Sequence, residues 1–394
     1  MRVLGVYNLP YFRTGGGVLT IRTIHEELAR GGHEAVCICT MRALGLDGQE
    51  TDTEDKSRAE LRANGIACAS DAREITFVHH GVTVHLVRSA SDIPGRLASL
   101  RRSWEPDWVG ILGPSTRTLT AAVMDQVPAE RVIAKFLAVI GLPFGPSRVV
   151  DDPEHTALFR SARAALCPSE YVQRYLARWG SIESRVMHVP VYGAIPPAPC
   201  NDPQGPITII NLSPIKGSDI FVQLAERMPD LPFLAMSSWA SDAETQRRLA
   251  ALPNVKISPP VPHERMHDVY CSSRILLAPT IVPEAFGLVV VEAMLRGVPV
   301  LASDSGGLRE AKLGVPHVLP VRAIDGVRAA ALPMQDVSPW LEVVRRLCTH
   351  PDEYAALSEL SHRTATAFVT GLCDRPYTSF LESLGPVPSR SAGH

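Results

Sequence analysis

The chain has 394 residues, of which 45% are hydrophobic and 20% are charged, and its formal net charge is −2 at pH 7. This length favours two domains with sizeable cores, and the composition excludes wholesale disorder. A net charge near zero offers no basic field for nucleic acid, and no apolar run reaches the roughly 18 residues that span a bilayer. The opening residues MRVLGVYNLP predict a first strand and not a signal peptide. The sequence therefore predicts a cytoplasmic protein with no integral membrane segment, while peripheral contact with a membrane stays open.

Two residue types are used unevenly. Among the 39 basic residues, lysine occurs only at positions 56, 135, 216, 256 and 312. This arginine bias is typical of a GC-rich coding sequence, and it makes each lysine conspicuous. The eight cysteines are scattered without a C-x-x-C pair, and most of them lie in apolar segments. This pattern predicts a reduced protein with buried thiols.

The first half of the chain alternates strands and helices. A glycine-bearing loop at residues 13–17 precedes apolar residues at helical spacing, which predict a helix over 19–29. Strands are expected over 2–7, 34–40, 82–88, 107–112 and 132–140. This alternation predicts a parallel sheet wrapped by helices.

A proline-rich connector, residues 192–206 (YGAIPPAPCNDPQGP), precedes a second alternating series. The expected strands there are 207–212, 233–237, 254–257, 274–279 and 298–302, the expected helices are 220–227, 262–271 and 287–296, and a helical tail covers 339–384. Two such halves predict an α/β protein of two Rossmann-like, doubly wound domains with a cleft between them. Ligands are expected at the carboxyl ends of the strands.

The stretch PEAFGLVVVEAMLRGVPV, residues 283–300, follows a predicted strand and opens a helix. The backbone N–H groups of Phe286, Gly287 and Leu288 are expected at the positive end of that helix, where they can bind an anion. Glycine at 287 allows a ligand close to the backbone. Glu284 and Glu292 can accept hydrogen bonds from sugar or ribose hydroxyls. The alternative interpretation is an acid that complements the helix dipole, together with a solvated glutamate.

Three further loops follow predicted strands. Lys216 and Gly217 come after the strand 207–212, where a cation suits a diphosphate leaving group; the alternative is an exposed loop lysine. The triple glycine Gly15, Gly16 and Gly17 allows close backbone approach to a ligand, although a flexible turn explains it equally. The stretch SDSGGLRE, residues 303–310, is a third strand-to-helix turn with paired glycines.

The motif EAFGLVVVEAM, with its two glutamates eight residues apart, resembles the E-x7-E signature of the GT-B retaining glycosyltransferases and is most similar to family GT4. The surrounding motifs agree in order: the GGG loop, Gly32-His33, CPSEYVQRYL at 167–176, Lys216-Gly217 and SDSGGLREA at 303–311. The resemblance covers nearly the whole chain. It implies a GT-B fold with an N-terminal acceptor-binding domain over 1–196, joined by C-terminal helices from about 368–394. The nucleotide-sugar-binding domain is then expected over 203–367.

The resemblance also implies a role for each residue. Glu292 is expected to bind the donor ribose, and Glu284 and Lys216 are the expected catalytic residues, at the donor sugar and the diphosphate. The other expected donor-binding residues are Gly15, Gly16, Gly17, Asn211, Gly217, Phe286, Gly287 and Leu288. The implied reaction moves a sugar from a UDP-, GDP- or dTDP-linked donor to an unknown hydroxyl acceptor with retained configuration. No metal and no cofactor beyond the nucleotide sugar are expected. The arginine bias favours a role in natural-product biosynthesis.

Two other functions stay open. The family has an arginine where this chain has Asn211, and the stretches 107–115 and 137–143 lack the family's histidine. These departures suit a nucleotide-sugar-binding protein that has lost catalysis. Separately, His263-Glu264-Arg-Met-His267 is a formal H-E-x-x-H motif. On one helix, its histidines would bind zinc and Glu264 would act as general base, as in a metalloprotease.

Overall fold

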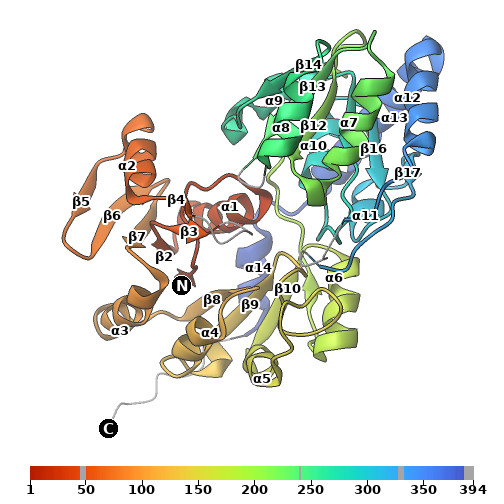
Figure 1. The fold of residues 1–394 in the computed structure, drawn as a ribbon. Helices are drawn as coiled ribbons and strands as arrows, with labels where there is room; N and C mark the ends of the chain where they lie inside the picture. The colour runs from red at the N-terminus through yellow and green to blue at the C-terminus, as the bar shows by residue number, and fades with distance from the viewer. Residues whose placement is uncertain (45–49, 239–240, 327–331, 386–394) are drawn as a thin grey trace. The chain divides into compact units, whose positions relative to one another are not determined.

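The computed structural model describes residues 1–44, 50–238, 241–326 and 332–385, and its ribbon is drawn in Figure 1. Backbone contacts divide the chain into two units. Unit 1 comprises residues 1–191 and the described residues from 373 on, and unit 2 comprises residues 192–372. The proline-rich stretch 192–206 therefore belongs to unit 2. It contains no helix or strand.

Unit 1 is built on a nine-stranded sheet in the order β11-β10-β9-β8-β1-β2-β7-β6-β5. Its pairings are parallel except those of β5 with β6 and of β6 with β7. The inner strands are continuous apolar runs because helices cover both faces of a parallel sheet. The strands are β1 Arg2–Val6, β2 Glu34–Thr40, β5 Cys68–Ser70, β6 Glu74–His79, β7 Val82–Val87, β8 Trp108–Gly113, β9 Val132–Phe136, β10 Ala164–Cys167 and β11 Arg185–Val186, with a separate pair of β3 Ala43–Leu44 and β4 Glu50–Asp52.

The helices of unit 1 present apolar stripes to this sheet. In α1, Val18, Ile21, Ile24 and Leu28 are buried at the spacing of one helix face. Side-chain caps at Thr53, Thr116, Asp152 and Ser169 begin four of the others. The helices are α1 Gly16–Arg30, α2 Glu54–Ala63, α3 Ile93–Ser103, α4 Arg117–Met124, α5 Pro153–Ser161, α6 Glu170–Tyr175 and α14 Pro376–Ser383, with short 3-10 turns at Ala90–Asp92 and Ala129–Arg131 and a π turn at Leu176–Gly180.

The last helix, α14, is fixed to α1 by a buried carboxylate. Glu27 accepts hydrogen bonds from the Thr378 amide at 2.8 Å, the Thr378 hydroxyl at 2.7 Å and the Tyr377 amide at 3.4 Å. These amides lie in the first turn of α14, where an anion is stabilised by the helix dipole. Glu27 therefore holds the C-terminal helix on unit 1.

Unit 2 contains a six-stranded parallel sheet in the order β14-β13-β12-β15-β16-β17. This is the Rossmann order 3-2-1-4-5-6, in which the chain reverses direction between β12 and β15. The strands are β12 Ile207–Leu212, β13 Phe233–Ser237, β14 Val255–Ser258, β15 Ile275–Ala278, β16 Val300–Ser303 and β17 Val318–Leu319. Their helices are α7 Ser218–Arg227, α8 Ala243–Ala250, α9 Met266–Cys271, α10 Leu288–Leu295, α11 Leu308–Ala311, α12 Ser338–Thr349 and α13 Pro351–Thr370, with 3-10 turns at Pro214–Lys216 and His263–Arg265.

The helical tail is divided between the units. The α12 and α13 helices belong to unit 2, where the His362 ring is hydrogen-bonded to the Leu295 carbonyl at 2.8 Å, so that α13 packs on α10. In Figure 1 both helices appear in blue beside the green strands of unit 2. Two expected elements were wrong in extent. The strand over 132–140 ends at Phe136, and the helix over 262–271 is a 3-10 turn followed by the short α9.

The expectation of reduced, buried thiols is confirmed for Cys37, Cys39 and Cys167 and was wrong for the others. Cys200 and Cys271 form a disulfide with a Cα–Cα distance of 5.0 Å, and both Cys68 and Cys373 are exposed. The two bonded cysteines are 71 residues apart in sequence, so their spacing gave no signal. The Cys200 amide also donates to the carbonyl of Arg296, at the end of α10, at 3.0 Å.

Candidate functional site

The loops that follow β12 and β15 lie side by side at the carboxyl edge of the unit 2 sheet. Strands β12 and β15 are neighbours at the point where the strand order reverses. The Ile215 carbonyl accepts hydrogen bonds from the Ile281 amide and from the Thr280 hydroxyl, both at 3.0 Å. Ligands of doubly wound sheets bind at this kind of reversal. The fold therefore places the Lys216 loop and the Glu284 loop at one candidate site.

An ion pair joins the two loops. The Lys216 Nζ atom donates to a Glu284 carboxylate oxygen. The two side chains are 29% and 26% exposed, so both are reachable from solvent. Lys216 lies in the 3-10 turn before α7, and Glu284 lies between β15 and α10. A diphosphate that entered here would meet the lysine, and a sugar hydroxyl would meet the carboxylate.

Glycines hold these loops in close contact. Gly217 has φ +80°, and a Cβ atom there would lie 2.1 Å from the Pro279 carbonyl oxygen. Gly306 has φ +62°, and a Cβ atom there would lie 2.3 Å from the Glu284 carbonyl oxygen. The Gly307 amide donates to that same oxygen at 2.7 Å. The SDSGG turn therefore braces the backbone of Glu284, and no larger residue fits there without moving it.

The start of α10 supplies backbone amides to this region. The helix begins at Leu288, with Gly287 as its N-cap at φ +114°. Within the described ranges, the amides of Gly287 and Leu288 donate no hydrogen bond to the protein. The helix begins only at Leu288, close to the expected start at 287, and it does not run through Glu284. Glu284 instead lies in an extended segment bridged to Gly306.

Glu292 is buried within unit 2, which contradicts the alternative of a solvated glutamate. Its side chain is 6% exposed. One carboxylate oxygen accepts the Tyr270 hydroxyl at 2.5 Å, and the other lies 3.7 Å from Nδ1 of His263. Burial raises the pKa of the Glu292 carboxyl, and Tyr270, His263 and Arg296 oppose this rise. Ionising Glu292 therefore costs folding stability, and the loss grows as the pH rises through the raised pKa.

Replacing Tyr270 with phenylalanine is expected to weaken nucleotide binding and to move its pH dependence upward. The change removes the hydroxyl that favours the ionised carboxyl, so the pKa of Glu292 rises further. A protonated carboxyl accepts fewer hydrogen bonds from ribose, so affinity should fall as the pH drops through that pKa. Calorimetric titration of UDP across about pH 5 to 8 measures the midpoint.

Tyr354→Phe is the matched control. Its hydroxyl donates to the Arg274 carbonyl at 2.8 Å and accepts from Asn201, so it also loses buried hydrogen bonds in unit 2. Its UDP affinity should keep the wild-type pH midpoint. Equal shifts in both variants would show that Tyr270 acts on general stability and not on Glu292.

Asn211 stands at an irregular point of β12. The pairing with β13 shifts register between Ile209 and Leu212, and Asn211 has φ +63° with an exposed side chain. Asparagine tolerates this left-handed conformation better than most residues. The position therefore suits asparagine on local grounds, and its neutral amide remains open to solvent at the carboxyl end of the strand.

The triple glycine lies in unit 1, after β1. Gly15, Gly16 and Gly17 are exposed, and α1 starts at Gly16 with Gly15 as its N-cap at φ +143°. A Cβ atom at Gly15 would meet nothing within 4 Å. The loop thus leaves open backbone at the carboxyl end of a central strand. Its role in donor binding stays a prediction.

Three polar side chains form a hydrogen-bonded series at the end of β8, and the sequence did not predict it. The Ser115 hydroxyl lies 2.7 Å from the Thr120 hydroxyl, which lies 3.0 Å from Nε2 of His155. His155 is buried and comes from α5, beyond the stretches searched for a histidine. Burial lowers the pKa of its imidazole. The pair Asp152-Pro153 is an N-cap signal for the helix that carries His155. Nothing in the sequence indicates that the His155 side chain lies near the end of β8.

The H-E-x-x-H residues do not converge on one point. His263 lies in the 3-10 turn and faces Glu292, whereas His267 lies on α9, with Nε2 3.5 Å from the Cys271 sulfur. Among the described residues, two clusters could hold a metal ion: Cys200, His267 and Cys271, and Glu26, His79 and His80. Neither cluster contains His263 or Glu264. The geometry gives no support to a zinc protease.

A cavity of about 500 Å³ opens beside the start of α7. Its lining includes Gly217, Asp219, Asp242 and Glu244, but not Lys216, Glu284 or Glu292. Its lining also includes the cation Arg248. Through Gly217 the cavity borders the Lys216 loop, but it does not contain the Lys216–Glu284 pair. Among the described residues, no helix combines the length and the apolar character that crossing a membrane requires.

Comparison with known proteins agrees with this geometry. Residues 210–312 match the family described as "Glycosyl transferases group 1". A D-inositol 3-phosphate glycosyltransferase of Mycolicibacterium smegmatis is 30% identical over 165 residues, which cover 40% of this chain and 35% of that protein. A protein of the same name from Streptomyces coelicolor is 27% identical over 179 residues, covering 41% and 36%. The matches thus span about a third of the length of these relatives.

The structural likeness is more extensive. Sucrose-phosphate synthase from Thermosynechococcus elongatus has a TM-score of 0.68 at 15% identity, covering 98% of each chain. Anabaena Alr3699/HepE, solved in complex with UDP and glucose, has a TM-score of 0.66 at 14% identity, covering 97% of this chain and all of that one. The predicted fold class is confirmed: the chain has the GT-B fold, and its residues 210–312 match the family of group 1 glycosyltransferases.

Proposed function

We propose that this protein is a retaining glycosyltransferase that moves a sugar from a nucleotide diphosphate to a hydroxyl of a small-molecule or sugar acceptor. The observation that carries the proposal is the Lys216–Glu284 pair at the strand reversal, next to the open amides at the start of α10. UDP is the first nucleotide to test, because two proteins of like fold, Anabaena Alr3699/HepE and S. aureus TarM, were solved with UDP.

In the proposed reaction, the bond between the sugar C1 atom and the diphosphate oxygen breaks, and a bond to the acceptor oxygen forms on the same face. The proton of the acceptor hydroxyl passes to the departing diphosphate oxygen as the nucleoside diphosphate leaves. Lys216 and the α10 amides stabilise the charge that develops on the departing diphosphate. Glu284 accepts hydrogen bonds from the sugar, and Glu292 accepts them from the ribose at acceptor positions that the Tyr270 hydroxyl does not occupy.

We propose that turnover needs no divalent metal, because Lys216 and the helix dipole already supply positive charge where the diphosphate would lie. Added EDTA should then leave the rate unchanged, and a rate restored only by Mg²⁺ or Mn²⁺ would contradict this part. Polyol phosphates are the first acceptors to test, since the curated relatives are named for inositol 3-phosphate. A role in natural-product biosynthesis rests on the arginine-rich composition alone.

Thermal denaturation with UDP, GDP and dTDP tests the donor site. A nucleotide at about 100 times its dissociation constant should add about 2.7 kcal/mol to the free energy of unfolding. Glu292→Gln keeps the size of the side chain but removes its charge, so it should weaken that nucleotide about tenfold or more. Glu226→Gln, an exposed glutamate of α7, should bind like wild type. No shift with any nucleotide would remove the donor-site assignment.

A second candidate function is suggested by the neutral, exposed Asn211 at the end of β12. Less positive charge near the diphosphate suits a protein that binds nucleotide sugars without transferring them. Incubation with UDP-glucose and a panel of hydroxyl acceptors separates the two functions. UDP release that depends on acceptor supports the transferase, whereas tight binding with no release supports the binding protein.

A further inference from the structure

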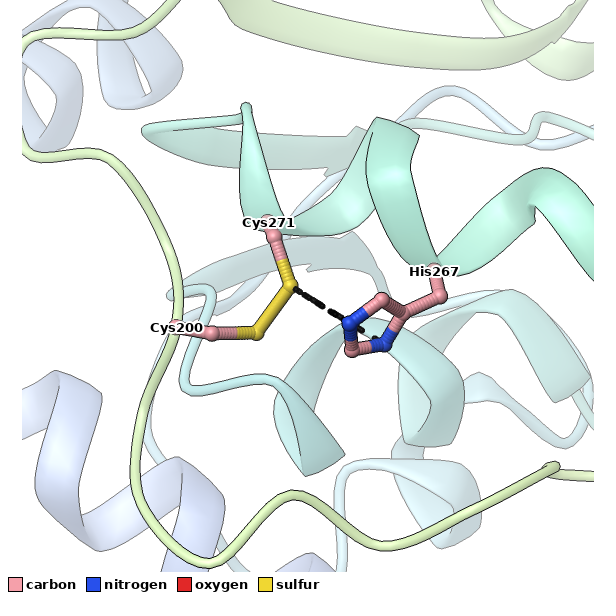
Figure 2. A group of neighbouring side chains, drawn as sticks. All are labelled: Cys200, His267 and Cys271. Atoms are coloured by element: carbon pink, nitrogen blue, oxygen red, sulfur yellow. Dashed lines mark hydrogen bonds between the residues drawn. A yellow bond between two sulfur atoms is a disulfide. The ribbon is translucent and has the colours of Figure 1, made fainter.

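Three side chains that the proposed reaction does not use gather in unit 2. Cys200 precedes β12, whereas His267 and Cys271 lie four residues apart on α9 and therefore on one face of that helix. The two cysteines form the disulfide, and Nε2 of His267 lies 3.5 Å from the Cys271 sulfur. Figure 2 shows the imidazole directed at this sulfur. His267 is exposed and both cysteines are half-buried, so small reagents can reach the group.

The protonation of His267 follows from its other neighbour. The Arg296 Nε atom donates to Nδ1 of His267 at 3.4 Å. Arginine can only donate, so Nδ1 carries the lone pair and Nε2 of the neutral ring carries the proton. That N–H is directed at the Cys271 sulfur, 3.5 Å away, where it can donate a hydrogen bond to a thiolate once the disulfide is open. Within the described chain, no side chain is hydrogen-bonded to the Cys200 sulfur.

We propose that Cys271 is a thiol-modification site that exchanges with low-molecular-weight disulfides, and that Cys200 is its resolving cysteine. In the reduced protein, the Cys271 thiolate attacks one sulfur of a disulfide RSSR, forms a mixed disulfide and releases one thiolate. The Cys200 thiolate then attacks the Cys271 sulfur of the mixed disulfide and expels the second RS⁻ thiolate. The two cysteine protons end on two RSH molecules, and two electrons pass from the cysteines to RSSR. The product is the Cys200–Cys271 disulfide of this structure.

This site is adjacent to a residue that supports Glu292. Tyr270, whose hydroxyl contacts Glu292 at 2.5 Å, immediately precedes Cys271. The amides of Cys200 and Asn201 both donate to the Arg296 carbonyl, at 3.0 and 3.2 Å. The disulfide thus ties the end of α9 to a segment fixed at the end of α10. Opening it should weaken UDP binding about threefold to tenfold, because Tyr270 must then be ordered on binding; this effect rests on the proposed function.

The exchange is tested on the full chain by reducing it, adding glutathione disulfide and mapping trapped thiols by mass spectrometry. Wild type should form the Cys200–Cys271 disulfide. Cys200→Ser should accumulate glutathione on Cys271, faster than on the exposed Cys68 and Cys373, which serve as internal comparisons. In that background, His267→Phe should slow modification of Cys271 about threefold or more. A rise of one unit in a thiol's pKa lowers its thiolate fraction about tenfold. The more basic thiolate is about threefold more nucleophilic, so the net rate falls about threefold.

The opposite pattern would overturn the assignment: glutathione on the Cys200 sulfur of Cys271→Ser at the faster rate, or equal rates at Cys68, Cys271 and Cys373. One Zn²⁺ held tightly by the reduced chain and lost in His267→Phe would also overturn it, in favour of a metal site. The UDP measurement is read separately. Equal UDP affinity in both redox states removes the coupling to Glu292. No binding of UDP, GDP or dTDP in either state removes the proposed donor site, while the thiol exchange stands on the mass spectra.

Discussion

Replacing Lys216 with methionine is expected to lower kcat about 10²- to 10³-fold while changing UDP affinity much less. Lys216 is the cation of the Glu284 pair at the strand reversal, where the leaving diphosphate is proposed to lie. Charge on that group grows as the sugar bond breaks, so a fixed cation stabilises the transition state more than the bound donor. Methionine keeps most of the length and packing of the side chain but removes the charge. Steady-state kinetics of sugar transfer measure the effect.

Lys256→Met is the matched control, because Lys256 is an exposed lysine of β14 in the same unit and the same charge is lost. Its kcat should equal that of wild type. If Lys216→Met keeps its kcat and loses only donor affinity, Lys216 holds the nucleotide but takes no part in catalysis. That result would contradict its assignment as a catalytic residue.

Gly306→Ala is expected to destabilise the chain by about 2–5 kcal/mol and to lower activity with it. Gly306 has φ +62°, and an added Cβ atom would lie 2.3 Å from the carbonyl oxygen and 2.4 Å from the amide nitrogen of Glu284. Both close atoms belong to backbone, so the SDSGG turn must move away from Glu284 to make room. Urea denaturation measures the stability, and sugar transfer measures the displacement of Glu284.

Gly314→Ala separates the two causes of this effect. Gly314 has φ +83°, but a Cβ atom there meets nothing within 4 Å. Only the backbone conformation is penalised, so the expected cost is about 1–2 kcal/mol with activity retained. Equal losses in the two variants would mean that steric contact with Glu284 adds nothing.

The sequence predicted much of the regular structure because buried parallel strands are continuous apolar runs. The strands over 34–40, 207–212 and 233–237 have the same bounds as β2, β12 and β13. The same rule failed over 132–140. There Val139 is buried in a loop after β9, and an apolar residue buried in a loop looks the same in sequence as one in a strand.

The pairing of Lys216 with Glu284 could be anticipated in part. Each follows a predicted strand, and carboxyl ends of parallel strands share one edge of a sheet. The sequence could not show that β12 and β15 are neighbours, which puts the two loops in contact. It also could not show that α10 starts only after Glu284, because helix starts depend on local backbone geometry such as the left-handed Gly287.

The sequence by itself determined the α/β alternation and the loops that contain Lys216 and Glu284, because both follow from side-chain periodicity and local backbone preference. The tertiary structure alone decided that Glu292 is buried against Tyr270, that His263 and His267 face different partners, and that Cys200 meets Cys271. These contacts join residues far apart in the chain, or depend on which way a short helix faces. They are fixed only when α9 and α10 pack on the sheet, since packing, and not spacing along the chain, sets which side chains share a low-dielectric environment.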